Sequence, residues 1–124
     1  MHTQKTILLV EDDKLMRDQL RALLQDGYDV LAARDGVEAS EIYEREKGRI
    51  DLVVTDYMMP RLDGVGLAEL LACHDLGLPI IMVSGSVGYK EIERLFNLPK
   101  FVLLWKPFDV KVLLDLVEGF TGGP

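Results

Sequence analysis

The chain has 124 residues, of which 48% are hydrophobic and 28% charged, so it is long enough for one domain with a real core and too apolar to be intrinsically disordered. Its formal net charge of −7 argues against direct binding to nucleic acid or to an anionic membrane. The single cysteine excludes an internal disulfide, the apolar runs are too short to span a membrane, and the start of the chain lacks the features of a signal peptide. We therefore expect one cytoplasmic domain over residues 1–124, with residues 121–124 as a linker or frayed end.

Five short apolar runs predict β-strands. In chain order they cover residues 7–10, 29–33, 52–55, 79–83 and 101–105. Most of them lack the alternation of polar and apolar residues that is typical of a half-exposed strand. This pattern indicates parallel strands that are covered on both faces.

Segments with helical periodicity separate these runs. Apolar stripes are formed by Met16, Leu20, Leu23 and Leu24, by Ala39, Ile42 and Tyr43, by Leu67, Leu70, Leu71 and His74, and by Val110, Leu113, Leu114 and Val117. Asp35 and Glu38 resemble a capping box that begins the second of these helices. The pattern over residues 87–96 predicts a further helix before the last strand. Five strands alternating with five helices predict an α/β fold with a parallel sheet and right-handed crossovers.

Polar and charged side chains follow four of the five runs. They are Glu11, Asp12 and Asp13 after the first run, Asp56 after the third, Ser84 and Gly85 after the fourth, and Lys106 after the fifth. The carboxyl ends of parallel strands meet at one edge of the sheet, where ligands of such folds bind. We therefore expect these residues to converge there.

The three carboxylates of Glu11, Asp12 and Asp56 predict a metal site. Two carboxylates about 4 Å apart repel by roughly 4 kcal/mol at an effective dielectric constant of about 20, so three in one pocket need cations or protons. Lys106 supplies one positive charge, and a divalent ion would supply two more. Carboxylate and carbonyl oxygens favour Mg²⁺, or Mn²⁺ as a substitute, over zinc.

The same residues predict phosphoryl transfer to an aspartate. The sequence contains no Walker loop, no glycine-rich dinucleotide fingerprint and no apparent Ser-His-Asp or Cys-His set. A carboxylate can accept a phosphoryl group as an acyl phosphate, and Asp56 is the best-placed carboxylate. The Ser84 hydroxyl, the Gly85 backbone N–H and Lys106 could then bond to the phosphoryl oxygens.

Four motifs give the chain a resemblance to a known family. They are Leu8-Leu9-Val10-Glu11-Asp12-Asp13, Thr55-Asp56-Tyr57-Met58-Met59-Pro60 with Asp63-Gly64, Val83-Ser84-Gly85, and Lys106-Pro107-Phe108. In this order, and at the ends of predicted strands, they resemble the receiver domain of two-component response regulators over essentially the whole chain. The resemblance implies a flavodoxin-like, doubly wound sheet of five parallel strands in the order 2-1-3-4-5, flanked by five helices.

The resemblance also implies a chemistry. Asp56 would accept a phosphoryl group from the phosphohistidine of a sensor histidine kinase or of a histidine phosphotransfer domain, with Mg²⁺ required. Asp12 would bind the metal directly, Glu11 through water, and Met58 through its backbone carbonyl. The domain would catalyse its own phosphorylation and dephosphorylation, and would not be an enzyme for an exogenous substrate.

The switching residues follow from the resemblance as well. Ser84 would be the switch hydroxyl and Lys106 would pair with the phosphate, with a cis Lys106-Pro107 bond. A downstream effector would bind the region of residues 87–120. Many receivers have Tyr or Phe three residues before the lysine, where this sequence has Leu103. Trp105 lies on the same face of the predicted strand, and we hypothesise that it takes part of that role.

Two alternatives stay open at this point. One is a protein-binding module on the same scaffold that works without phosphorylation. The other is an aspartate-nucleophile phosphatase, although such enzymes carry a second aspartate two residues after the nucleophile, where this chain has Met58. Separately, we expect Cys73 to be a small buried apolar residue. The sequence does not indicate whether the domain stands alone or belongs to a hybrid kinase or a longer regulator.

Overall fold

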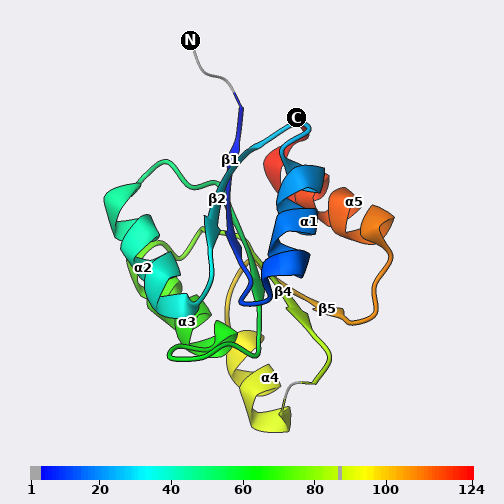
Figure 1. Ribbon diagram of the computed structural model, residues 1–124. Helices are drawn as coiled ribbons and strands as arrows, with labels where there is room; N and C mark the ends of the chain where they lie inside the picture. The colour runs from blue at the N-terminus through cyan, green and yellow to red at the C-terminus, as the bar shows by residue number, and fades with distance from the viewer. Residues whose placement is uncertain (1–3, 87) are drawn as a thin grey trace.

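The protein, described here by a computed structural model, is a central parallel sheet with helices on both faces (Figure 1). The structure describes residues 4–86 and 88–124. In chain order the elements are β1 (Thr6–Val10), α1 (Lys14–Leu24), β2 (Asp29–Ala33), α2 (Gly36–Arg45), β3 (Leu52–Asp56), α3 (Gly64–His74), β4 (Ile80–Ser84), α4 (Tyr89–Leu95), β5 (Phe101–Trp105) and α5 (Val110–Thr121). The predicted alternation of five strands and five helices is confirmed.

The sheet has the strand order β2-β1-β3-β4-β5, and all four strand pairs are parallel. The order predicted from the family resemblance is therefore confirmed. β1, β3 and β4 are buried along their whole length, which explains why their sequences are continuously apolar. Because the strands run in one direction, the residues that follow β1, β3, β4 and β5 emerge at the same edge.

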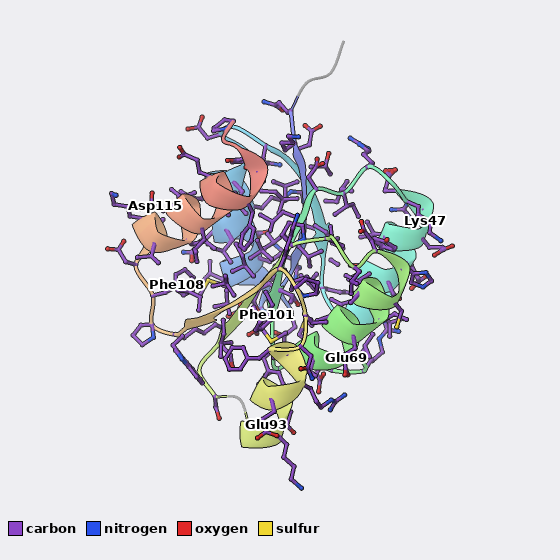
Figure 2. All side chains as sticks on the ribbon, turned by 180° about the vertical axis from the view of Figure 1, so that it is seen from behind. Lys47, Glu69, Glu93, Phe101, Phe108 and Asp115 are labelled. Carbon is purple, nitrogen blue, oxygen red and sulfur yellow. The ribbon has the colours of Figure 1, made fainter. Side chains whose placement is uncertain are left out.

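Alternate residues of the strands supply two separate cores. Leu8, Val10 and Val53 pack toward α2, α3 and α4, whereas Ile7 and Leu9 pack toward α1 and α5. Figure 2 shows side chains filling the space between the sheet and both helical layers. This double burial fixes the register of the central strands, because a shift by one residue would exchange the two faces.

Aspartates begin four of the helices. Asp13, Asp35, Asp63 and Asp109 are the N-caps of α1, α2, α3 and α5, and each side chain accepts a hydrogen bond from a backbone N–H of the first turn. The cap predicted at Asp35 is thus confirmed. α5 ends at Thr121, the first residue of the segment predicted to be a linker or frayed end, and that assignment stays a prediction.

Several details differ from the sequence predictions. α4 covers Tyr89–Leu95, shorter than the predicted 87–96, and Val87 lies outside the described residues. Cys73 is exposed, so its predicted burial is wrong. Leu70 is 38% exposed, because α3 buries the face of Leu67 and Leu71 and turns its neighbours outward. In the described part of the chain, no helix is long and apolar enough to cross a membrane.

Candidate functional site

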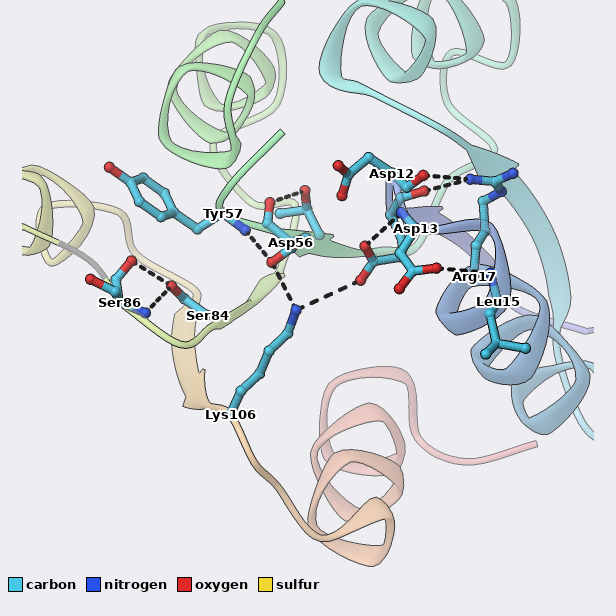
Figure 3. Close-up of polar contacts among 11 residues, drawn as sticks. Asp12, Asp13, Leu15, Arg17, Asp56, Tyr57, Ser84, Ser86 and Lys106 are labelled. Atoms are coloured by element: carbon cyan, nitrogen blue, oxygen red, sulfur yellow. Dashed lines mark hydrogen bonds and ion pairs between the residues drawn. The ribbon is translucent and has the colours of Figure 1, made fainter. Parts of the chain in front are cut away.

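Three carboxylates gather at the carboxyl edge of the sheet (Figure 3). Glu11 follows β1 directly, Asp12 is the next residue, and Asp56 is the last residue of β3. One carboxylate oxygen from each residue lies within 4.8 Å of the others. Glu11 and Asp56 are buried, with 4% and 7% of their surface exposed, while Asp12 is exposed. The structure therefore brings together the acidic residues that the sequence predicted to converge.

Lys106 reaches this acidic cluster from the end of β5. Its Nζ lies 3.3 Å from Oδ1 of Asp56 and 3.9 Å from Oε1 of Glu11. Its backbone N–H donates to the carbonyl of Ser84, which fixes the start of the side chain against β4. The peptide bond between Lys106 and Pro107 is cis, as the resemblance implied. One ammonium group beside three carboxylates leaves two negative charges uncompensated when all four groups are ionised.

The environment of Glu11 favours the protonated acid. Burial raises the pKa of its carboxyl group from 4.5 to about 7. The hydrogen bond from the backbone N–H of Asp13 opposes this shift, Asp56 adds to it by charge repulsion, and Lys106 offsets part of it. Two buried carboxylates beside one lysine are therefore incompletely compensated, and a cation would reduce their repulsion.

This raised pKa predicts how the metal-free protein responds to pH. Between pH 4.5 and about 7, Glu11 holds a proton in the folded state that it has lost in the unfolded state. The stability should therefore fall as pH rises through this window, by at most roughly 3 kcal/mol, and level off above it. Urea unfolding in a chelator at several pH values measures this. The Glu11→Gln variant should lose this part of the slope, and an unchanged slope would contradict the assignment.

Ser84, the last residue of β4, is held by the segment that follows it. Its hydroxyl donates to the carbonyl of Ser86 at 2.8 Å and accepts from the Ser86 N–H at 3.0 Å (Figure 3). The side chain is buried with the residue 1% exposed. The hydroxyl thus lies at the predicted strand end, and it must leave Ser86 before it can bond to a group on Asp56.

Met58 lies in the connection between β3 and α3, two residues beyond Asp56. Its side chain is exposed, and the metal-binding role predicted for its carbonyl stays a prediction. The neighbouring Tyr57 N–H donates to Oδ1 of Asp56 at 2.9 Å and so orients that carboxylate. Asp13 instead caps α1 by accepting a hydrogen bond from the Leu15 N–H and does not belong to the acidic cluster.

Sequence reasoning missed two arginines near the site. Nη1 of Arg17 donates to the carbonyl of Glu11 at 2.8 Å and so supports the backbone of the acidic segment. Arg61 lies in the connection between β3 and α3 and donates several hydrogen bonds to Asp35, the N-cap of α2. Nothing in the sequence indicates the backbone contact of Arg17 or connects Arg61 with Asp35.

The donor set decides which metal fits. The cluster offers carboxylate oxygens, and no histidine or cysteine belongs to it. A hard divalent cation such as Mg²⁺ prefers oxygen ligands and needs only a few protein carboxylates, since it keeps several waters. The residues present therefore fit Mg²⁺, and the ammonium of Lys106 adds a fixed positive charge beside Asp56.

Comparisons with known proteins agree with this geometry. The family model of the response regulator receiver domain matches residues 7–118. Residues of this chain are 43% identical over 117 positions to the sensor kinase CckA of Brucella abortus, covering 91% of this chain and 12% of that protein. They are 38% identical over 113 positions to the response regulator MprA of Mycobacterium leprae, covering 90% of this chain and 49% of that protein.

A solved structure has the same fold. The non-phosphorylated HemR receiver domain of Leptospira biflexa superposes with a TM-score of 0.84 at 34% identity, covering 95% of this chain and 94% of that one. The chain spans about half or less of the length of the two curated relatives, a kinase and a response regulator. The family match extends over almost the whole chain and includes every residue of the acidic cluster and Lys106. The chain belongs to the response regulator receiver domain family of two-component systems.

Proposed function

We propose that this domain accepts a phosphoryl group on Asp56, in the presence of Mg²⁺, from the phosphohistidine of a sensor histidine kinase or of a histidine phosphotransfer domain. The observation that carries the proposal is the position of Asp56. It ends the central strand β3, lies 3.3 Å from the Lys106 ammonium and shares a cluster with Glu11 and Asp12. Receiver domains serve as signalling switches and are not enzymes for an external substrate, in keeping with this assignment.

The transfer step is a substitution at phosphorus. A carboxylate oxygen of Asp56 forms the new P–O bond while the P–N bond of the phosphohistidine breaks, and its electron pair returns to the imidazole. Lys106 is close enough to pair with a phosphoryl oxygen once its contact with Asp56 is loosened. The Tyr57 N–H holds Oδ1 of Asp56, so the carboxylate is oriented before the donor arrives.

Glu11, Asp12, Asp56 and the backbone carbonyl of Met58 would hold the metal. When bound, Mg²⁺ supplies positive charge that stabilises the phosphoryl oxygens during transfer. Without it, an incoming phosphoryl group would approach a cluster that already has more negative than positive charge. The carboxylates therefore make the reaction depend on the metal.

Phosphorylation would then change the surface of the domain. The new anion competes with Ser86 for the Ser84 hydroxyl, which makes both of its hydrogen bonds with Ser86 in this structure. Turning the hydroxyl toward Asp56 frees the segment between β4 and α4 from that contact. We propose that an effector reads this change over residues 87–120, although Val87 lies outside the described residues. The equilibrium between the two states is shifted by the phosphoryl group.

Trp105 gives this change an optical readout. It is the register partner of Ser84 across the pairing of β4 with β5 and is 48% exposed. We expect the fluorescence of the single tryptophan to change when a phosphoryl mimic such as beryllofluoride binds with Mg²⁺. The Ser84→Ala variant should bind the mimic with a smaller change. A mimic that binds and leaves the wild-type emission unaltered would disprove the role proposed for Trp105.

Intact-mass analysis after treatment with acetyl phosphate tests the proposed function. We expect one added phosphoryl group with Mg²⁺ and none in a chelator. Absence of Mg²⁺-dependent labelling would overturn the proposal and favour a binding module that works without phosphorylation. Sustained hydrolysis of an aryl phosphate would instead favour a phosphatase.

A further inference from the structure

The connection between β3 and α3 contains a residue in an unfavourable backbone conformation. Arg61 has φ 69°, in the left-handed region, and is the one residue other than glycine with positive φ among residues 4–86 and 88–124. A side chain in this region clashes with its own backbone, which is why glycine usually occupies it. Something outside the local turn must therefore favour arginine at this position.

Arg61 binds Asp35 at the start of α2. Nε of Arg61 donates to Oδ2 of Asp35 at 3.1 Å, and Nη2 donates to Oδ1 at 2.9 Å and to Oδ2 at 2.8 Å. The Asp35 side chain is only 8% exposed, and its Oδ1 also accepts the Glu38 N–H that caps α2. Both oxygens of a nearly buried carboxylate thus accept hydrogen bonds from the planar guanidinium group, a geometry that lysine cannot reproduce.

Two glycines let the backbone segments meet closely around this pair. A Cβ at Gly36, the first residue of α2, would collide with the backbone carbonyl of Leu62. A Cβ at Gly64 would lie 2.5 Å from the carbonyl oxygen of Asp56. The Gly64 N–H donates to the carbonyl of Tyr57 at 2.9 Å and closes the connection. The connection between β3 and α3 is therefore enclosed between the first turns of α2 and α3. A displacement of Arg61 would also displace Asp56 and Met58.

We infer that the Arg61–Asp35 ion pair is a positioning device for the divalent-cation site. By fastening the connection between β3 and α3 to the N-terminus of α2, it would keep Asp56 and the backbone of Met58 in place beside Glu11 and Asp12. Arg61 does not belong to the acidic cluster and acts through the backbone alone. The inference rests on the proposed function, because it concerns the same site.

Two variants remove the ion pair while keeping the local structure. Arg61→Gly deletes the side chain and accepts the left-handed conformation without strain. Asp35→Asn keeps an oxygen that caps α2 and removes the negative charge that pairs with the guanidinium group of Arg61. We expect the Kd for Mg²⁺, measured by calorimetric titration with MgCl₂, to rise about tenfold in each variant. The Kd of the double variant should be no higher than that of either single variant, since both changes break the same interaction.

A matched control is available on the neighbouring helices. Arg94 of α4 makes a two-pronged ion pair with Glu69 of α3 that does not touch the connection between β3 and α3. Glu69→Gln should therefore leave the Kd for Mg²⁺ unchanged. Urea unfolding in a chelator separates positioning from simple stability, because a positioning role weakens Mg²⁺ binding in the variants even where the metal-free protein remains fully folded.

The results of these titrations can overturn the inference in three ways. Wild-type affinity in both variants, with or without a loss of stability, would overturn the inference and leave the proposed function intact. Additive losses in the double variant would also overturn it, because the two residues would then act separately. A wild-type protein that binds no Mg²⁺ and takes up no phosphoryl group from acetyl phosphate would overturn the proposed function together with this inference.

Discussion

Replacing Asp56 with asparagine is expected to abolish phosphoryl uptake while the domain stays folded. The amide has nearly the shape of the carboxylate, and its oxygen can still accept hydrogen bonds from the Tyr57 N–H and from Lys106, as Oδ1 does in this structure. An amide cannot form the acyl phosphate. With acetyl phosphate and Mg²⁺, intact-mass analysis should show one added group on the wild type and none on Asp56→Asn.

Asp63→Asn is the matched control for this variant. Asp63 lies in the same connection and caps α3 by accepting the Gly66 N–H, a role that asparagine also fills. This control should be labelled like the wild type. Labelling of Asp56→Asn to the wild-type level would show that another residue accepts the phosphoryl group and would end the proposed mechanism.

Much of this site could be predicted because strand ends are encoded by simple periodicity. Continuous apolar runs indicate buried parallel strands, so the residue after each run has a known place in space. That argument predicts that Glu11, Asp56, Ser84 and Lys106 lie at one edge, without any knowledge of side-chain conformation, and the structure places them there.

The rest depends on conformations that periodicity does not encode. The hydrogen bonds of Ser84 to Ser86 depend on a side-chain rotamer and on the path of the following segment. The pairing of Arg61 with Asp35 joins two connections that are 26 residues apart in sequence. The predicted burial of Cys73 is wrong because α3 covers one face of the sheet and buries only a narrow stripe, and Cys73 lies beside that stripe.

Under the proposed function, the contact between Ser84 and Ser86 would define the unphosphorylated state. A buried hydroxyl needs a partner, and here the backbone of Ser86 supplies both a donor and an acceptor. A phosphoryl group on Asp56 can attract the Ser84 hydroxyl only if their interaction is more favourable than these two hydrogen bonds. On this proposal, the unphosphorylated state would be held by a modest and replaceable interaction, as expected of an equilibrium that one charged group can shift.

The cost of keeping carboxylates together should appear when one of them is neutralised. Two unit charges 4.8 Å apart, the distance within which the ligand oxygens of the cluster lie, repel by about 3 kcal/mol at an effective dielectric constant of about 20. Solvent around the exposed Asp12 and the charge of Lys106 reduce this repulsion. Asp12→Asn should therefore stabilise the metal-free domain by about 1 kcal/mol at pH 8, where Glu11 is ionised.

The same variant should lose the stabilisation that Mg²⁺ gives the wild type. A ligand that binds only the folded state adds about 2.7 kcal/mol to the free energy of unfolding at a hundred times its Kd. Urea unfolding of both proteins in MgCl₂ and in a chelator measures the difference. Asp13→Asn, which changes the adjacent carboxylate that caps α1, should keep the wild-type response. If Mg²⁺ stabilised Asp12→Asn as strongly as the wild type, the metal would bind elsewhere. A gain in resting stability coupled to loss of the metal response would instead show that the acidic cluster is maintained for binding at the expense of the fold.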